Sequence, residues 1–143
     1  MVPRAAAALL LVDDEPAVRA VLGAGLAAQG FQVTEAEGAA AALDWLEAGG
    51  RPDAMVTDLA MPGGVDGLGL LQAARRRLPG LPAVLITGHA GDAAQGALQA
   101  AAAAGPFAVL RKPAAAEAVA AQVVTVLRGS PPAEAGREAG TGR

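Results

Sequence analysis

The chain lacks cysteine and tyrosine, and only 2% of its residues are aromatic. Without cysteine, disulfide bonds and thiol catalysis are excluded, and a reducing compartment is expected. Histidine and serine occur once each, as His89 and Ser130. Ser130 lies in a C-terminal stretch rich in proline and glycine, so a Ser-His-Asp triad is not expected, and zinc sites built on histidine and cysteine cannot be assembled. The side chains left for chemistry are carboxylates, threonines, His89 and one lysine, Lys112.

Charge and hydropathy restrict the partners to be expected. The net charge is −3, the sequence pI is about 5.0, and no basic arm is present. The chain therefore lacks the basic surface that binding of duplex nucleic acid would require. The start, MVPRAAAALLLV, imitates a signal peptide, but it meets Asp13 without a cleavage site, and no apolar run reaches the ~18 residues of a transmembrane helix. We expect a cytoplasmic protein that binds neither nucleic acid nor membrane.

Short apolar runs alternate with helical periodicity along the chain. The predicted strands are Ala8–Val12, Phe31–Glu35, Ala54–Asp58, Ala83–Thr87 and Phe107–Leu110. The predicted helices are Pro16–Gln29, Ala39–Glu47, Leu68–Arg77, Ala93–Ala103 and Ala115–Leu127. Pro16 suits the first turn of its helix, and Asp14 suits a cap just before it.

This alternation indicates an α/β fold in which a parallel sheet is covered on both faces. Right-handed crossovers leave few topologies, and we expect the flavodoxin-like, doubly wound five-stranded sheet of order 2-1-3-4-5. The length of 143 residues fits one domain, which we assign to residues 1–128. From Gly129 on, GSPPAEAGREAGTGR has no periodicity, so residues 129–143 are predicted to be a disordered tail.

Polar side chains stand at the ends of four predicted strands. Asp13 and Asp14 follow the first strand, Asp58 ends the third, Thr87 ends the fourth, and Lys112 follows the fifth. In open α/β sheets, ligands bind outside the carboxyl ends of the strands, near the point where strand order reverses. Because these strands are consecutive neighbours in the expected sheet, the five side chains should face one crevice.

The residue types in this crevice suit phosphoryl chemistry. Three carboxylates together need a cation, and an all-oxygen cluster suits Mg²⁺. A phosphoryl group that bridges the metal and Lys112 would use every member of the set. Asp58, alone at the central strand end, is the natural nucleophile, because a carboxylate can form an aspartyl phosphate. Of the 11 basic residues only Lys112 is a lysine, which favours a need for a compact point charge.

Each residue also has an ordinary structural interpretation. Asp13 and Asp14 could be a helix cap and a solvated turn acid, Asp58 a turn acid, and Thr87 a plain strand former. We favour the shared site, because all of them fall at matching strand ends. For His89 we favour a solvated loop histidine over a role in dephosphorylation, because it has no partner ligands.

Three further features are assigned structural roles. We expect Trp45 to pack in the core from its helix. Arg75–Arg77 are interpreted as a solvated helix C-terminus that complements the helix dipole. Asp66–Gly67 is interpreted as loop and cap geometry, with Gly67 permitting the turn.

Four stretches together resemble the receiver domain of two-component response regulators. They are VDDEP (12–16), TDLAMPGGVDG (57–67), LITG (85–88) and LRKP (110–113), and they occur in the family's order. The resemblance covers residues about 8 to 128. The stretches VTDLAMPGG and VLRKP are also similar to those of receivers attached to hybrid histidine kinases.

The resemblance implies a phosphorelay function. Asp58 would accept a phosphoryl group from a phosphohistidine of a histidine kinase or a histidine phosphotransfer domain. Asp13 and Asp14 would hold Mg²⁺ together with Asp58, and the backbone carbonyl of Ala60 would complete the metal site. Such a domain is a signalling switch that catalyses its own phosphorylation and dephosphorylation, and it is not a turnover enzyme.

The resemblance also assigns the switch residues. Thr87 would be the switch hydroxyl, and Lys112 would contact the phosphate, with a cis peptide before Pro113. The family usually has an aromatic residue three positions before the lysine, where this chain has Val109. Phe107 lies on the same face of the predicted strand, and we expect it to substitute in part.

Partner surfaces and rival functions follow from the same resemblance. The helix at 16–29 and the loops around the site would dock the histidine-bearing partner. The face formed by the fourth helix, fifth strand and fifth helix would carry the output, and it is a candidate surface for a weak homodimer. Two rivals stay open. One is a pseudo-receiver that binds partners without phosphorylation; the other is a Mg²⁺-dependent aspartyl-phosphate phosphatase, which would want an acid where Ala60 stands.

Overall fold

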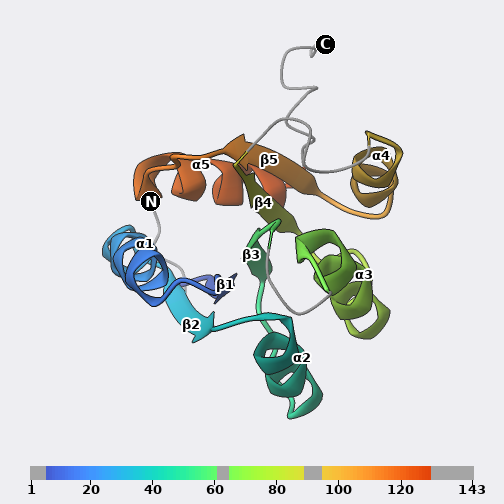
Figure 1. The fold of residues 1–143 in the computed structure, drawn as a ribbon, viewed down its shortest axis with the longest axis horizontal. Helices are drawn as coiled ribbons and strands as arrows, with labels where there is room; N and C mark the ends of the chain where they lie inside the picture. Colours follow the sequence, from blue (N-terminus) through green and yellow to red (C-terminus); the bar gives the residue numbers. More distant parts are fainter. Residues whose placement is uncertain (1–5, 61–64, 89–94, 130–143) are drawn as a thin grey trace.

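The computed structural model describes residues 6–60, 65–88 and 95–129 (Figure 1). Strands and helices alternate along the chain, and the five strands form one parallel sheet of order β2-β1-β3-β4-β5. The strands are β1 (Ala8–Val12), β2 (Gln32–Ala36), β3 (Ala54–Asp58), β4 (Ala83–Thr87) and β5 (Phe107–Arg111). The helices are α1 (Pro16–Ala28), α2 (Ala39–Glu47), α3 (Gly67–Arg77), α4 (Gln95–Ala103) and α5 (Ala116–Leu127). The predicted flavodoxin-like topology is confirmed.

Predicted boundaries shift where the backbone hydrogen bonds require it. β2 begins at Gln32, because the amide of Phe31 still donates to the carbonyl of Leu26 at the end of α1. β5 continues to Arg111, which pairs with Thr87 in the neighbouring strand. Residues 93 and 94 of the predicted fourth helix lie outside the described residues. β2 ends at Ala36, one residue later than predicted, and the other shifts are of one residue at a helix end: Ala28 for α1, Gly67 for α3 and Ala116 for α5.

The sheet is buried on both faces, as its continuous apolar strands predicted. In Figure 1, α1 and α5 cover one face, while α2, α3 and α4 cover the other. Leu26 and Val119 are fully buried on the first side, and Leu70 is fully buried on the second. Trp45 of α2 packs partly buried against the second core, which confirms its predicted role. Within the described residues, no helix is long and apolar enough to span a bilayer.

The predicted cap at the start of α1 is wrong. Glu15, not Asp14, is the residue that precedes the helix, and it makes no side-chain capping bond. The carboxylate of Asp13 instead accepts the backbone N–H of Glu15 at 2.9 Å. Since Pro16 fixes the first helical position, Asp14 stands one residue too early to cap, and its side chain belongs to the acidic cluster described below.

The start of α3 is held against the end of β3. Asp66 caps the helix, since its Oδ1 accepts the N–H of Gly69 at 2.8 Å, as predicted. Gly67 is needed for a different reason than the sequence suggested. Its φ is not in the left-handed region, but a Cβ there would lie 2.5 Å from the carbonyl oxygen of Asp58. Only glycine lets the helix approach the backbone of Asp58 this closely.

Arg75 is not part of a solvated helix end, and the prediction for it is wrong. Its guanidinium is half-buried and donates to three backbone carbonyls, those of Leu81 at 3.0 Å, Ala101 at 2.6 Å and Pro106 at 3.1 Å. Burial lowers the pKa of Arg75 from its ordinary value. Arg76 and Arg77 are exposed, as predicted. Arg75 therefore joins α3 to the last turn of α4 and to the residues just before β4 and β5. These contacts lie at the end of the sheet opposite the acidic residues.

We predict that Arg75→Met lowers the free energy of unfolding by about 2 kcal/mol, because three carbonyls lose their donor together. Urea denaturation followed by circular dichroism measures the change. Arg76→Met, one residue along on the exposed side, is the matched control and should stay within about 0.5 kcal/mol of the native protein. Equal losses in the two variants would contradict the role given to Arg75.

Candidate functional site

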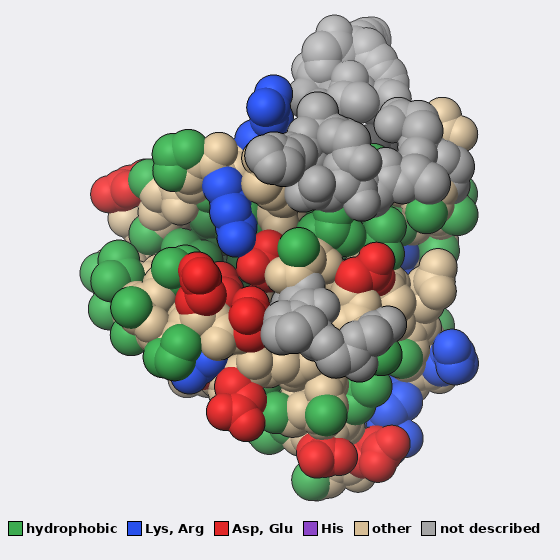
Figure 2. Space-filling view, in the orientation of Figure 1, with side chains coloured by type: hydrophobic (Ala, Val, Ile, Leu, Met, Phe, Trp, Pro, Cys, Tyr) green, Lys and Arg blue, Asp and Glu red, His purple; other side chains and the backbone are tan. Residues whose placement is uncertain are grey.

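Three carboxylates meet at the carboxyl ends of β1 and β3. Asp13 and Asp14 follow β1, Asp58 ends β3, and one carboxylate oxygen from each lies within 4.8 Å of the others. Asp13 and Asp58 are each only 4% exposed. Figure 2 shows acidic side chains gathered near the middle of the face in view, with a basic side chain beside them. The predicted convergence of these acids is what the fold produces.

The backbone around Asp13 is fixed from several sides. Its amide donates to the carbonyl of Ala36 in β2 at 3.2 Å, and its carboxylate accepts the N–H of Glu15. Its carbonyl oxygen accepts a hydrogen bond from Nη1 of Arg19 at 2.7 Å. The sequence patterns did not single out Arg19, although a basic residue on the helix that follows an acid pair is a signal that could have drawn attention to it.

Asp58 and Lys112 form a partly buried ion pair at the carboxyl end of the sheet. Nζ of Lys112 donates to Oδ2 of Asp58 at 3.1 Å. Oδ1 of Asp58 is buried and has no hydrogen-bond partner of good geometry among the described residues. Burial raises the pKa of Asp58; Lys112 acts against the rise, Asp13 adds to it, and the backbone N–H of Ala60 lowers it slightly. One oxygen of Asp58 is thus paired, and the other is left available.

Lys112 reaches the acids from the loop after β5. Its backbone N–H donates to the carbonyl of Thr87 at 2.8 Å, and the peptide bond to Pro113 is cis, as expected. Burial lowers the pKa of Lys112, but the hydrogen bond and charge of Asp58, helped by Asp13 and Glu15, outweigh this and leave the pKa raised. Both pKa values are raised, but with opposite consequences for charge. Burial dominates at Asp58 and disfavours its ionised form, while the charge of Asp58 dominates at Lys112, whose side chain is 38% exposed, and favours its protonated form.

The other predicted site residues occupy the same edge of the sheet or fall outside the description. Thr87 ends β4, is 5% exposed, and pairs with Arg111. Ala60 follows β3 and is exposed. His89 lies outside the described residues, so neither of its two interpretations is tested.

Phe107 does not take the place of the missing aromatic residue, so this expectation is wrong. It pairs with Ala83 at the start of β4, whereas Thr87 pairs with Arg111 four positions further along. At about 3.3 Å per residue this separation is about 13 Å. Phe107 is buried with α3 and α4, and Val109 is 40% exposed. The two share a face of the strand, but only Val109 lies near the carboxyl end.

The acidic cluster suits a hard divalent cation. Its ligand atoms are carboxylate oxygens, and the cluster carries more negative charge than Lys112 neutralises. Oδ1 of Asp58 is buried and has no hydrogen-bond donor among the described residues. Mg²⁺ takes such oxygen ligands together with water and phosphate oxygens. Asp13, Asp14 and Asp58 are therefore a candidate magnesium site, with an ammonium group alongside that can pair with an anion.

This geometry is that of a known family. A model of the response regulator receiver domain matches residues 9–124. The chain belongs to the response regulator receiver domain family. Its cluster of three aspartates at the strand ends and its strand order are accordingly those of a receiver domain.

The relatives of this receiver domain include transcriptional regulators. It is 40% identical over 104 residues to the DNA-binding transcriptional regulator NtrC of Escherichia coli K12, a match that covers 72% of this chain and 21% of NtrC. It is 35% identical over 127 residues to the transcriptional regulatory protein GlrR of the same organism, covering 87% of this chain and 27% of GlrR. The chain thus spans about a fifth to a quarter of the length of these curated relatives.

Solved receiver structures have the same fold. A response regulator receiver domain protein from Clostridium thermocellum superposes with a TM-score of 0.74 at 26% identity, covering 85% of this chain and 94% of that one. A receiver protein from Sinorhizobium medicae WSM419 gives a TM-score of 0.72 at 30% identity, covering 86% and 95%.

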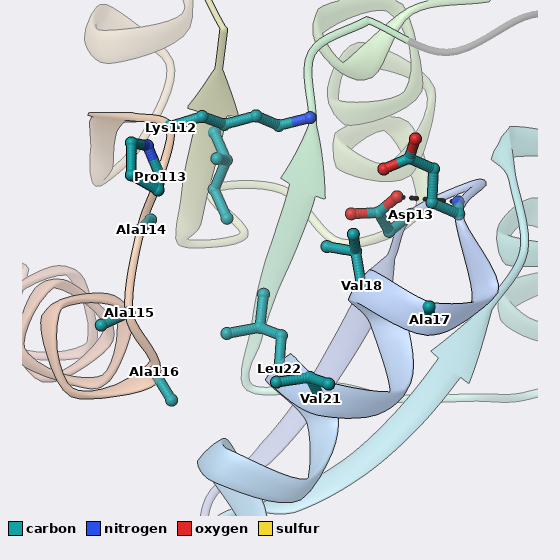
Figure 3. Close-up of a pocket in the computed structure, with 12 residues that line it drawn as sticks. Asp13, Ala17, Val18, Val21, Leu22, Lys112, Pro113, Ala114, Ala115 and Ala116 are labelled. Carbon is teal, nitrogen blue, oxygen red and sulfur yellow. Dashed lines mark hydrogen bonds between the residues drawn. The ribbon is translucent and has the colours of Figure 1, made fainter.

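A groove of about 730 Å³ runs beside the acids of this receiver domain. Figure 3 shows its two walls: Val18, Val21 and Leu22 of α1 face the stretch Pro113–Ala116 before and at the start of α5. Lys112 stands at its upper end. Val21 is 74% exposed, which is unusual for a residue of its size and polarity.

We predict that Asp58→Asn stabilises the metal-free domain at pH 7 by about 1 kcal/mol, because it removes a buried charge from between other acids. The pKa of Asp58 is raised above 3.8, so the native state holds the proton more tightly than the unfolded state. Its contribution to stability therefore falls as pH rises from 3.8 through the native pKa, and the advantage of the variant should vanish below that window.

Denaturation in EDTA across the acid and neutral range measures this difference. Asp44→Asn is the matched control, because it makes the same change at an exposed carboxylate on α2. A variant at Asp58 that is less stable than the native protein at pH 7 would contradict the prediction.

Proposed function

We propose that this receiver domain accepts a phosphoryl group from a phosphohistidine onto Asp58, as a switch in two-component signalling. The observation that carries the proposal is the state of Asp58: Oδ2 is paired with Lys112, while Oδ1 is buried without a partner among the described residues. A carboxylate held in this way is oriented, and it keeps one oxygen available for bond formation.

The residues for a metal-assisted transfer surround it. Asp13, Asp14 and Asp58, with the backbone carbonyl of Ala60, would hold Mg²⁺. When bound, Mg²⁺ neutralises charge on the oxygens of the transferred group. Lys112 would pair with another of those oxygens, and the hydroxyl of Thr87 would bond to the same group once transfer is complete.

Transfer of the phosphoryl group from histidine to Asp58 needs no further reactant. A carboxylate oxygen of Asp58 forms a bond to phosphorus as the bond from phosphorus to the histidine nitrogen breaks, and the nitrogen keeps the electron pair. Lys112 would move from Asp58 to the transferred oxygens, and the 38% exposure of its side chain leaves space for that movement. Attack by water on the phosphorus of the aspartyl phosphate returns the carboxylate and resets the switch.

The groove beside the acids supports the docking of a histidine-bearing partner. On the α1 wall of the groove, Val18 and Val21 are apolar and exposed, and Lys112 stands at one end of the groove. A partner helix that presents a phosphohistidine would therefore bury Val18 and Val21 while it delivers the phosphoryl group to the acids. We propose a histidine kinase or a histidine phosphotransfer domain as this partner.

The output face is proposed on α4, β5 and α5. Val109 on β5 and Val124 on α5 are 40% and 37% exposed there, which supports a weak homodimer or an output partner on this face. The likeness to hybrid-kinase receivers stays a prediction, since the relatives described above are transcriptional regulators. Localisation in the cytoplasm also stays a prediction.

The test of the proposal is incubation with acetyl phosphate and Mg²⁺, followed by intact mass. We expect a single phosphoryl adduct that disappears with EDTA and in Asp58→Asn. Asp53→Asn is the matched control: Asp53 also carries a carboxylate at a strand, where Oδ2 accepts the N–H of Ala8, but it lies at the opposite end of β3. This control should keep the adduct.

The other outcomes decide between the rivals. Absence of an adduct in the native protein under these conditions would favour a pseudo-receiver. Rapid release of inorganic phosphate over many turnovers would favour an aspartyl-phosphate phosphatase. Either result would overturn the proposal that Asp58 is a stable phosphoacceptor.

We predict that Val21→Glu slows phosphotransfer from a phosphorylated histidine phosphotransfer domain at least tenfold, because a charge must then be buried in the groove. The rate from acetyl phosphate should stay unchanged, since Val21 lies away from the acids along α1. Quench-flow measurement of both rates checks the prediction. An equal loss with both donors would mean that the groove does not dock the partner.

A further inference from the structure

Arg19 links α1 to the backbone that carries the acid pair. Its guanidinium donates from Nη1 to the carbonyl oxygen of Asp13 at 2.7 Å and from Nε to Oε1 of Glu35 at 3.3 Å. Only 17% of the Arg19 side chain is exposed, and its bond to the carbonyl of Asp13 is partly buried, whereas the bond to Glu35 is open to solvent. One planar group thus joins α1, the end of β1 and β2.

Glu35 packs against α1, although 43% of its side chain is exposed. It lies on β2 opposite Leu11 of β1, and its carboxylate rests against α1 at Gly23, where an added Cβ would stand 2.6 Å from Oε2. The guanidinium of Arg19 is therefore held from one side by a carboxylate, and it holds the carbonyl of Asp13 on the other. Because the guanidinium is planar and donates on two sides, it fixes the direction of the Asp13 carbonyl as well as its distance from Arg19.

We propose that Arg19 is a positioning residue for magnesium, acting through the backbone of Asp13 without touching the ion. Asp13 and Asp14 are adjacent, so a rotation of the peptide between them would redirect both carboxylates at once. The hydrogen bond from Arg19 to the carbonyl of this peptide opposes that rotation. The inference rests on the proposed magnesium site and adds the residue that sets its geometry.

Charge and positioning predict opposite results, which makes the inference testable. A guanidinium near a cation site repels the cation, so if charge were its only effect, Arg19→Gln would tighten Mg²⁺ binding and Arg19→Lys would leave it unchanged. Positioning predicts that both variants bind Mg²⁺ more weakly, because neither glutamine nor lysine can donate to Asp13 and Glu35 with the same planar fork.

The experiment is a Mg²⁺ titration of the whole chain, followed by the amide NMR shifts of Asp13 and Asp58, without any phosphoryl donor. We expect the dissociation constant to rise about tenfold in Arg19→Gln, the scale found when a residue that orients a metal ligand is lost. Arg19→Lys should lie between this variant and the native protein. Glu35→Gln, which loosens Arg19 but leaves it in place, should also weaken binding.

Arg128→Gln is the matched control, because it makes the same change of charge at an exposed residue just after α5. It should leave the dissociation constant unchanged. The midpoint of thermal unfolding in EDTA is measured alongside, so that a purely structural role appears as a lower midpoint with unaltered Mg²⁺ affinity.

Unaltered or tighter Mg²⁺ binding in folded Arg19→Lys and Arg19→Gln would overturn the inference while leaving the proposed function standing. Absence of saturable Mg²⁺ binding in the native protein would remove the magnesium site, and the inference would fall with it. If Arg19→Gln does not fold, Arg19→Lys and Glu35→Gln decide.

Discussion

Repulsion among three carboxylates is the constraint on which the rest of this structure depends. Asp13, Asp14 and Asp58 are brought within 4.8 Å of one another at the end of a buried sheet, where charge is costly. Lys112 offsets only part of that charge, and among the described residues Oδ1 of Asp58 has no hydrogen-bond donor. The cluster is therefore unfavourable without a cation, which is the property on which the proposed binding of Mg²⁺ and a phosphoryl group rests.

Separate elements of the fold keep the acids in place against this repulsion. Arg19 of α1 holds the carbonyl of Asp13, and glycine at position 67 lets α3 begin directly against the carbonyl of Asp58. Lys112 lies in the loop after β5, and its backbone N–H donates to the carbonyl of Thr87. Each restraint comes from a different helix or strand, so the geometry of the site is a property of the whole sheet and not of any one loop.

The far end of the sheet is anchored in a different way. Arg75 ties three carbonyls there, including one at the end of α4, so α4 is fastened at the end remote from the acids. Val109 of β5 is exposed. Phe107 is buried at the start of the strand, four positions before Arg111, the residue that pairs with Thr87. The end of the sheet remote from the acids is therefore held by hydrogen bonds from one arginine side chain.

The sequence by itself determined the sheet order, most element boundaries and the convergence of the acids with Lys112, because apolar strand runs and polar residues at their ends are local patterns. It also identified the family through four short motifs. It did not determine the cap of α1, the burial of Arg75, the reason for Gly67, the failure of Phe107 to substitute, or the role of Arg19. All of these depend on which atoms of distant segments meet, and a carbonyl that accepts a bond leaves no trace in the side-chain pattern. Only the tertiary structure decided them.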